Sequence, residues 1–173
     1  YVRYWWEVSR SSSRWRPLVK GGEFRRFFGN RDFVVDWSPR ALEHYESHGG
    51  LYANSSRGRA GITWTMITGQ PSFRLKGPGD EFDSASPTIL PTSEDVSMEA
   101  TLAYLNSDAA LEILAAINPT INNRVTDILE LRLPPAFEER RDEVERASAE
   151  AIDATRELDG FSETSADACP AFE

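Results

Sequence analysis

The stretch from Lys20 to Asn30, KGGEFRRFFGN, brings together residue types that bind phosphate groups. A Walker-type loop places Lys and then Ser or Thr after its second glycine, and a Rossmann turn has three spaced glycines between a strand and a helix. Here the lysine precedes the glycines, no Ser or Thr follows them, and the three-glycine pattern is missing. The stretch therefore does not predict a nucleotide-binding loop.

The same stretch fits a surface that binds a larger polyanion. Its glycines would let the backbone approach phosphates closely, while the basic side chains supply charge and the aromatic rings hold the loop in place. Contacts of this kind position a protein on a DNA duplex without reading its sequence. A surface turn with incidental charge is the open alternative. The candidate contact residues are Lys20, Gly21, Gly22, Arg25, Arg26 and Arg31.

The charge of the chain is divided between its two halves. The formal net charge is -9, but residues 1–76 hold 13 Lys and Arg against 6 Asp and Glu, whereas residues 77–173 hold 6 against 22. Association with a charged partner depends on the local field, so a basic half can bind nucleic acid within an acidic protein. Arginine outnumbers lysine 17 to 2, and its planar fork fits phosphates and base edges. Genomic base composition would explain that ratio equally well.

The segment INPTIN, Ile117 to Asn122, shares its first two motif residues with the Asn-Pro-Pro-aromatic loop of amino-methyltransferases. In that loop the polar side chain accepts a hydrogen bond from the target amino group. Thr120 and Ile121 replace the second proline and the aromatic ring, and the segment follows a helical pattern rather than a strand. We interpret Asn118-Pro119 as a helix stop.

Other chemistry-bearing residues predict no catalytic or metal site. His44 and His48 have helical i, i+4 spacing, but the residue after His44 is Tyr45 rather than the glutamate of the zincin motif. Cys169 has no second cysteine, which excludes disulfides and favours a reducing, cytoplasmic location. No apolar run approaches the roughly 18 residues of a membrane span, so we expect no membrane partner.

The pattern along the chain predicts an α+β fold: a small mixed or antiparallel sheet with a helix pair, followed by a long C-terminal helix. Helices are expected after the capping residues Ser38, Ser93 and Ser107. Alternation, or enrichment in branched and aromatic residues, marks strands at residues 1–9, 33–37, 62–68, 72–75, 87–91 and 127–135. The last of these would close a first domain, residues 1–135.

Residues 136–173 are predicted to form a helical extension that packs on the rest of a longer parent protein. Between residues 137 and 161, apolar residues recur at steps of three, four or seven, which is typical of a narrow helix–helix seam. We expect its partner to lie outside this chain, which reads as a piece of a larger protein. The seam consists of Phe137, Val144, Ala147, Ala151, Ala154, Leu158 and Phe161.

Four blocks in fixed order resemble the C-terminal part of the large adenine-specific DNA methyltransferases of BREX phage-defence systems, the PglX family, and of related fused restriction-modification enzymes. They are RWRPLVKGGEFRRFFGNRDFVVDW, GITWTMITGQPSFRLKGPGDEFDSASPTILP, TLAYLNSDAALEILAAINPTINNRVTDILELRLP and DGFSETSAD. The resemblance covers nearly the whole chain. Residues 38–60 are its least similar part.

The resemblance implies a division of labour. A methyltransferase core upstream, with its S-adenosylmethionine loop, would flip and methylate an adenine, while this segment grips flanking double-stranded DNA and sets the target sequence. The core's motifs are not in this chain, so we expect no cofactor bound by the segment itself. Arg57, Arg59, Arg74 and Lys76 are the next candidate DNA contacts. The alternative is an interaction module that docks another defence-system protein, and a self-sufficient enzyme is a third hypothesis.

Overall fold

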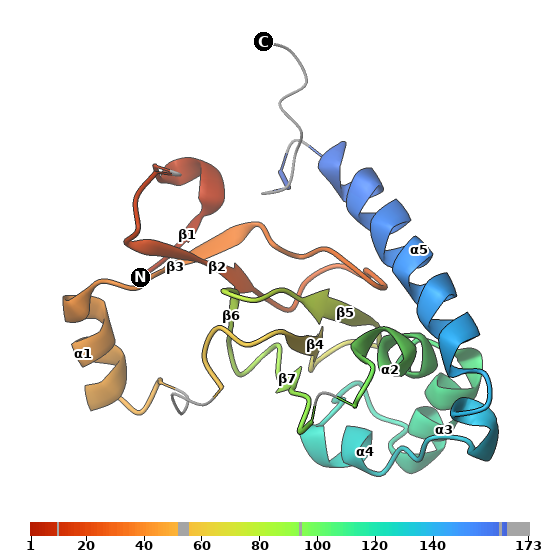
Figure 1. The fold of residues 1–173 in the computed structure, drawn as a ribbon. Coiled ribbons are helices and arrows are strands. Elements are labelled where there is room, and N and C mark those ends of the chain that lie inside the picture. The colour runs from red at the N-terminus through yellow and green to blue at the C-terminus, as the bar shows by residue number, and fades with distance from the viewer. Residues whose placement is uncertain (10, 52–55, 94, 163, 166–173) are drawn as a thin grey trace.

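A computed structural model of the chain describes residues 1–9, 11–51, 56–93, 95–162 and 164–165. Over these residues the strands form a four-stranded sheet in the order β1-β3-β2-β6 and a three-stranded sheet in the order β5-β4-β7 (Figure 1). The predicted α+β class is confirmed. The strands are β1 (Val2–Tyr4), β2 (Trp15–Val19), β3 (Phe33–Asp36), β4 (Gly61–Trp64), β5 (Phe73–Lys76), β6 (Glu81–Phe82) and β7 (Thr88–Ile89).

Both sheets are held together mainly by antiparallel pairs. β3 lies between β1 and β2, with Val35 opposite Val2 and Phe33 opposite Leu18, and only β6 runs parallel to its neighbour β2. β4 is the central strand of the second sheet, with Thr63 opposite Arg74. Gly61 allows β7 to come close, because a Cβ there would lie 2.4 Å from the carbonyl oxygen of Ile89.

Serine caps begin the three main helices of the first 120 residues. Ser38 accepts a hydrogen bond from the Ala41 N–H and is followed by Pro39, which suits a first helical turn. Ser107 caps its helix in the same way, as predicted. The second cap is Ser97 rather than Ser93, so that helix starts four residues later than expected. The helices are α1 (Pro39–Ser47), α2 (Met98–Leu105), α3 (Asp108–Ile117), α4 (Val125–Leu129) and α5 (Arg141–Gly160), with 3₁₀ turns at Trp5–Glu7 and Pro135–Phe137.

The main core lies between the three-stranded sheet and the helices. Trp64 and Phe73 project from β4 and β5 onto Leu102 of α2, and none of these side chains is more than 1% exposed. The complete cluster is Ile62, Trp64, Phe73, Leu102, Leu105, Leu114, Ile128 and Ile152. Because Ile128 and Ile152 belong to α4 and α5, one core joins this sheet to elements from the end of the chain.

The predicted strand at residues 127–135 is wrong. Residues 125–129 form the short helix α4, and Ile128 enters the core while Leu133 stays 50% exposed. Asp127 stabilises this turn, because its carboxylate accepts hydrogen bonds from the backbone N–H of Arg124 at 3.1 Å and from the Asn118 amide at 2.6 Å. The apparent alternation was too short to separate a strand from a helical turn fixed by side-chain hydrogen bonds.

The long helix α5 is present, but its predicted seam is covered only in part, since Val144 and Ala151 are half-buried. Its buried residues are Ser148 and Ile152, which face α2, whereas Leu158 and Phe161 of the predicted seam are 70% and 79% exposed. The expectation that α5 has no partner within the chain is therefore wrong. Small side chains let α5 lie close to α2, and the apolar pattern alone did not reveal that face. The division of the chain at residue 135 stays a prediction.

Among the described residues, no single helix combines the length and the apolar composition of a membrane span. α2 and α3 meet that criterion only when they are joined across their 63° bend.

Candidate nucleic-acid interface

The loop that connects β2 to β3 is anchored on the three-stranded sheet. The backbone of Phe27 pairs with β5, since its N–H donates to the Phe73 carbonyl at 2.9 Å and its carbonyl accepts from Leu75 at 2.8 Å. Phe27 takes a positive φ of 67°, an uncommon conformation that aims its neighbours in different directions. Phe28 is buried and Phe24 is 46% exposed. The Phe27 backbone and the buried Phe28 ring therefore hold the loop in place, whereas the Phe24 ring lies at the surface.

The two glycines let the loop pass close to the protein's own backbone. A Cβ on Gly21 would lie 3.1 Å from the methyl group of Thr65 and 3.2 Å from the carbonyl oxygen of Ala85. The Gly22 N–H donates to the Thr65 hydroxyl at 3.4 Å. Close internal packing is thus a sufficient reason for these glycines, whether or not the loop also approaches an external phosphate.

Three basic residues of the loop reach the surface. The Lys20 ammonium lies 3.8 Å from the Asp83 carboxylate, and the Arg25 guanidinium lies 3.4 Å from that of Glu23. Exposed pairs at such distances are weak and exchange readily with solvent or another anion. Arg26 extends over the Phe24 ring, 5.4 Å from its centroid. Arg25, whose side chain is 45% exposed, is therefore the most accessible of these three cations, while Arg26 is half-buried.

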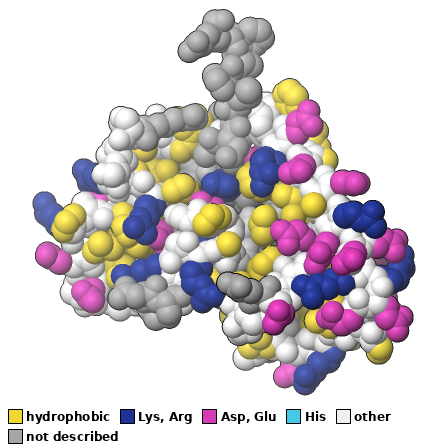
Figure 2. All heavy atoms as spheres, in the orientation of Figure 1, with side chains coloured by type: hydrophobic (Ala, Val, Ile, Leu, Met, Phe, Trp, Pro, Cys, Tyr) yellow, Lys and Arg dark blue, Asp and Glu magenta, His cyan; other side chains and the backbone are white. Residues whose placement is uncertain are grey.

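Carboxylates on the other side of the loop limit its positive charge. A cavity of 220 Å³ separates the loop from the end of α5 and is lined by Asp32 and Asp159 as well as Lys20 and Arg25. Burial raises the pKa of Asp32, and the neighbouring charge of Asp159 raises it further. Where Lys20 and Arg25 face the end of α5, these carboxylates therefore offset part of their charge. Figure 2 shows acidic side chains gathered over the side of the molecule that α5 occupies.

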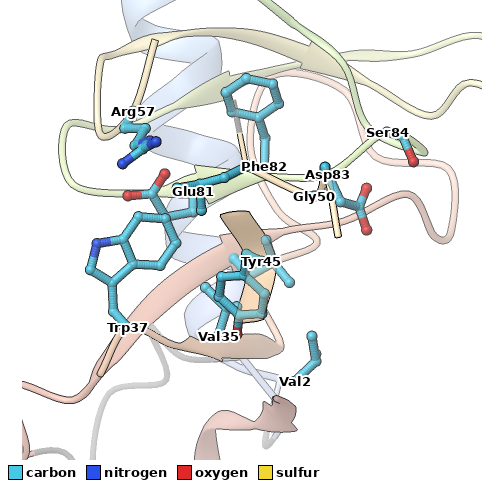
Figure 3. Close-up of a pocket in the computed structure, with 13 residues that line it drawn as sticks. Val2, Val35, Trp37, Tyr45, Gly50, Arg57, Glu81, Phe82, Asp83 and Ser84 are labelled. Atoms are coloured by element: carbon cyan, nitrogen blue, oxygen red, sulfur yellow. The ribbon is translucent and has the colours of Figure 1, made fainter. Parts of the chain in front are cut away.

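Arg31, Arg57 and Arg59 are tied to other parts of the chain. Arg31 is largely buried and pairs with Asp80 at 3.1 Å, which braces the turn between β5 and β6. Arg59 is exposed and donates to the Pro91 carbonyl at 2.8 Å. Arg57 lines a cavity of 360 Å³ whose walls include the rings of Trp37 and Tyr45 (Figure 3).

Arg74 is fully buried in β5. Its Nη2 donates to the Thr65 hydroxyl at 3.3 Å, whereas Nε and Nη1 have no hydrogen-bond partner within the described part of the chain. Burial lowers the pKa of Arg74 to about 10, so the guanidinium is still charged at neutral pH. Arg74 thus carries a charge without an ion-pair partner among the described residues. It lies close to the loop that connects β2 to β3, because the Thr65 hydroxyl accepts from both Arg74 and the Gly22 N–H.

Lys76 is also fully buried and satisfied internally. Its ammonium donates to the carbonyl oxygens of Asp80, at 2.6 Å, and of Arg59. Burial lowers the pKa of Lys76. Neither Arg74 nor Lys76 reaches the surface, and a role for them as DNA contacts stays a prediction.

The other motifs have structural roles. Asn118 ends α3 as predicted, and its amide donates to the Asn122 carbonyl and the Asp127 carboxylate while its oxygen accepts from Thr120. The rings of His44 and His48 lie 4.2 Å apart. Across the described ranges of the chain, no group of three or more His, Cys, Asp or Glu side chains could hold a metal ion.

Two arginines that the sequence did not single out, Arg3 and Arg40, line a separate cavity beside the start of α1. They are 37 positions apart in the sequence. The arginine excess of the first 76 residues is the only sequence signal that includes them.

Comparison with known proteins finds similarity to two adenine-specific methyltransferases. No protein-family model matches it. The adenine-specific methyltransferase BrxX of Escherichia coli O9:H4 (strain HS) is 28% identical over 138 residues, which make up 74% of this chain and 12% of BrxX. The adenine-specific methyltransferase PglX of Lacticaseibacillus casei (strain Zhang) is 30% identical over 129 residues, 69% of this chain and 11% of PglX. The chain is related to these methyltransferases.

This relation confirms the coarser part of the predicted resemblance to BREX methyltransferases. The chain spans only about a tenth of the length of these curated relatives. The activity of these whole proteins therefore cannot be assigned directly to the 173 residues of this chain.

Proposed function

We propose that the chain is the DNA target-recognition segment of an adenine-specific methyltransferase of a phage-defence system. The observation that carries this proposal is the similarity of most of the chain to a small part of two adenine-specific methyltransferases. A methyltransferase needs a surface that holds duplex DNA next to the base it modifies. The exposed Arg25 and the half-buried Arg26 would supply such a surface here, on a loop held by the buried Phe28.

In this proposal the chemistry belongs to another part of the protein. The methyltransferase core of the same protein binds S-adenosylmethionine and the flipped adenine. This segment binds the flanking duplex and recognises the target sequence. Arginines contact phosphates or the purine edges of the major groove. The proposed contacts of the segment with double-stranded DNA are Lys20, Gly21, Gly22, Arg25 and Arg26, with Arg57 and Arg59 at the periphery.

The double substitution Arg25→Ala with Arg26→Ala tests this placement in the full-length protein. If both side chains contact phosphates, DNA binding weakens and the slope of log K against log salt becomes less steep by about 1 to 2. The measurement is duplex binding by fluorescence anisotropy over a salt series.

A matched control removes the same charge from the acidic side of the molecule. Arg140 and Arg146 are exposed on or beside α5, where Arg140 pairs with Glu143 and Arg146 donates to the Asp142 carbonyl. Arg140→Ala with Arg146→Ala should leave the salt slope unchanged. Equal behaviour of the two double variants would remove the loop from the DNA surface.

A second candidate function is a protein-interaction module that does not contact DNA. The exposed apolar residues Leu158 and Phe161 at the end of α5 favour it, because exposed apolar patches mark contacts with other proteins. The partner in that case is the rest of the same protein or another defence-system protein. The salt series separates the two functions, since an interaction module leaves DNA binding insensitive to every substitution in residues 1–76.

A further inference from the structure

A cavity of 290 Å³ opens where β1, the start of β2 and the start of α1 meet. Three guanidinium groups line it, from Arg3, Arg14 and Arg40, and its walls include the rings of Tyr1 and Trp15. Its one acidic lining residue is Asp36. Arginine guanidiniums gathered around a concave surface suit an oxyanion, which their planar forks bind through paired N–H donors.

Asp36 does not neutralise the whole cavity, because its carboxylate is already engaged. One oxygen accepts from Arg14, and the other accepts from the Ser38 N–H at 2.9 Å. The hydrogen bond from Arg14 holds the pKa of Asp36 well below its usual range, so the carboxylate stays ionised and paired. Arg14 and Asp36 thus form a neutral unit at one wall.

Arg3 and Arg40 are the two other arginines that line the cavity. Both are exposed, and neither forms an ion pair with a carboxylate of the described residues. Arg3 donates only to the carbonyl of its neighbour Val2, at 2.8 Å. In contrast, Lys20, Arg25 and Arg31 of the predicted loop each have a carboxylate within 4 Å. The cavity therefore carries an excess of about two positive charges.

The start of α1 adds to this positive field. α1 has nine residues and begins directly after its capping residue Ser38, so that Arg40 lies in its first turn. The unpaired N–H groups of a helix start act as a partial positive charge and favour an anion nearby. The start of α1 and the side chains of Arg3 and Arg40 all make the electrostatic potential in the cavity more positive.

We propose that this cavity binds a phosphate of the DNA backbone and is a second anchor, separate from the loop after β2. The proposal rests on the proposed function, since it assigns the anion to the same duplex. In Figure 1, α1 lies at the opposite end of the molecule from α5, and the loop lines a cavity with the end of α5. Two separate anchors fix the orientation of a duplex, which a single loop cannot do.

The test is the double substitution Arg3→Ala with Arg40→Ala in the full-length protein, with Arg14 kept so that Asp36 retains its partner. Duplex binding over a salt series should weaken, with a slope of log K against log salt less steep by about 1 to 2. Arg3→Lys with Arg40→Lys keeps both charges and should restore most of the slope. Both side chains are exposed, so the thermal unfolding of each variant should match that of the unsubstituted protein.

Three outcomes decide the proposal. An altered slope that the lysine variant restores supports the cavity as a phosphate anchor. An unaltered slope for Arg3→Ala with Arg40→Ala, while Arg25→Ala with Arg26→Ala changes it, overturns the second anchor and leaves the proposed function standing. Unaltered slopes for both alanine pairs overturn the anchor and the proposed function together, and binding of an acidic peptide in the cavity becomes the remaining explanation for its charge.

Discussion

Replacement of Asn106 by alanine should lower the free energy of unfolding by about 2 to 4 kcal/mol. Asn106 follows the last turn of α2 and is 5% exposed. Its side-chain oxygen accepts from the Phe73 N–H at 3.0 Å, and its amide donates to the carbonyls of Phe73, at 2.9 Å, and Leu102, at 3.2 Å. Alanine would leave the buried N–H of Phe73 without a partner and detach β5 from α2.

Chemical denaturation of residues 1–173 measures this effect. Asn122→Ala is the matched control, because Asn122 is exposed and none of the described contacts involves its side-chain amide, so the change should stay below about 0.5 kcal/mol. Asn106→Asp keeps an acceptor but sets a buried carboxylate against the carbonyls of Phe73 and Leu102, so it should cost at least as much as alanine. A loss for Asn106→Ala no larger than that of the control would contradict the role of Asn106 as the link between β5 and α2.

Replacement of Arg74 by methionine should raise the free energy of unfolding by about 1 to 3 kcal/mol at neutral pH. Methionine has a similar length and no charge to desolvate. Arg74 has one hydrogen bond, to Thr65, and its pKa is lowered to about 10 by burial. A buried basic group with a lowered pKa destabilises the folded state wherever the group is protonated, so its removal is favourable at pH 7.

The pH dependence gives this prediction a second check. In the unfolded chain Arg74 binds its proton to a higher pH than in the folded chain, so the stability of the unsubstituted protein rises with pH above about 10. The advantage of Arg74→Met should shrink in that range. Arg74→Lys keeps a buried charge and should give no gain. A marked loss of stability in Arg74→Met at neutral pH would mean that the guanidinium is compensated, and would contradict its description as an unpaired charge.

Local signals in the sequence were enough to predict several elements. Ser38-Pro39 and Ser107 begin helices where their side chains cap the first turn, and Asn118-Pro119 ends one, because these effects involve neighbouring residues only. Two nearby serines were possible caps for α2, and local pattern alone did not distinguish Ser97 from Ser93. The nature of α4 depended on a longer-range contact, the hydrogen bond from Asn118 to Asp127.

The candidate site shows a similar limit. The sequence identifies cations but not their partners, so Arg31 looked as available as Arg25 until the structure placed Asp80 beside it. Arg74 and Lys76 were further candidate DNA contacts in the sequence, but the fold buries both side chains completely. Arg3 and Arg40 are brought together only by the fold, which no local pattern could have predicted.

The central claim, that this segment sets the DNA sequence methylated by its protein, can be tested by a segment exchange. Residues 1–135 are replaced in the full-length protein by the corresponding part of a related adenine-specific methyltransferase with a different target, and genomic DNA from expressing cells is sequenced for modified bases. The methylated motif should change to that of the donor. Retention of the original motif by an active exchanged protein would contradict the central claim.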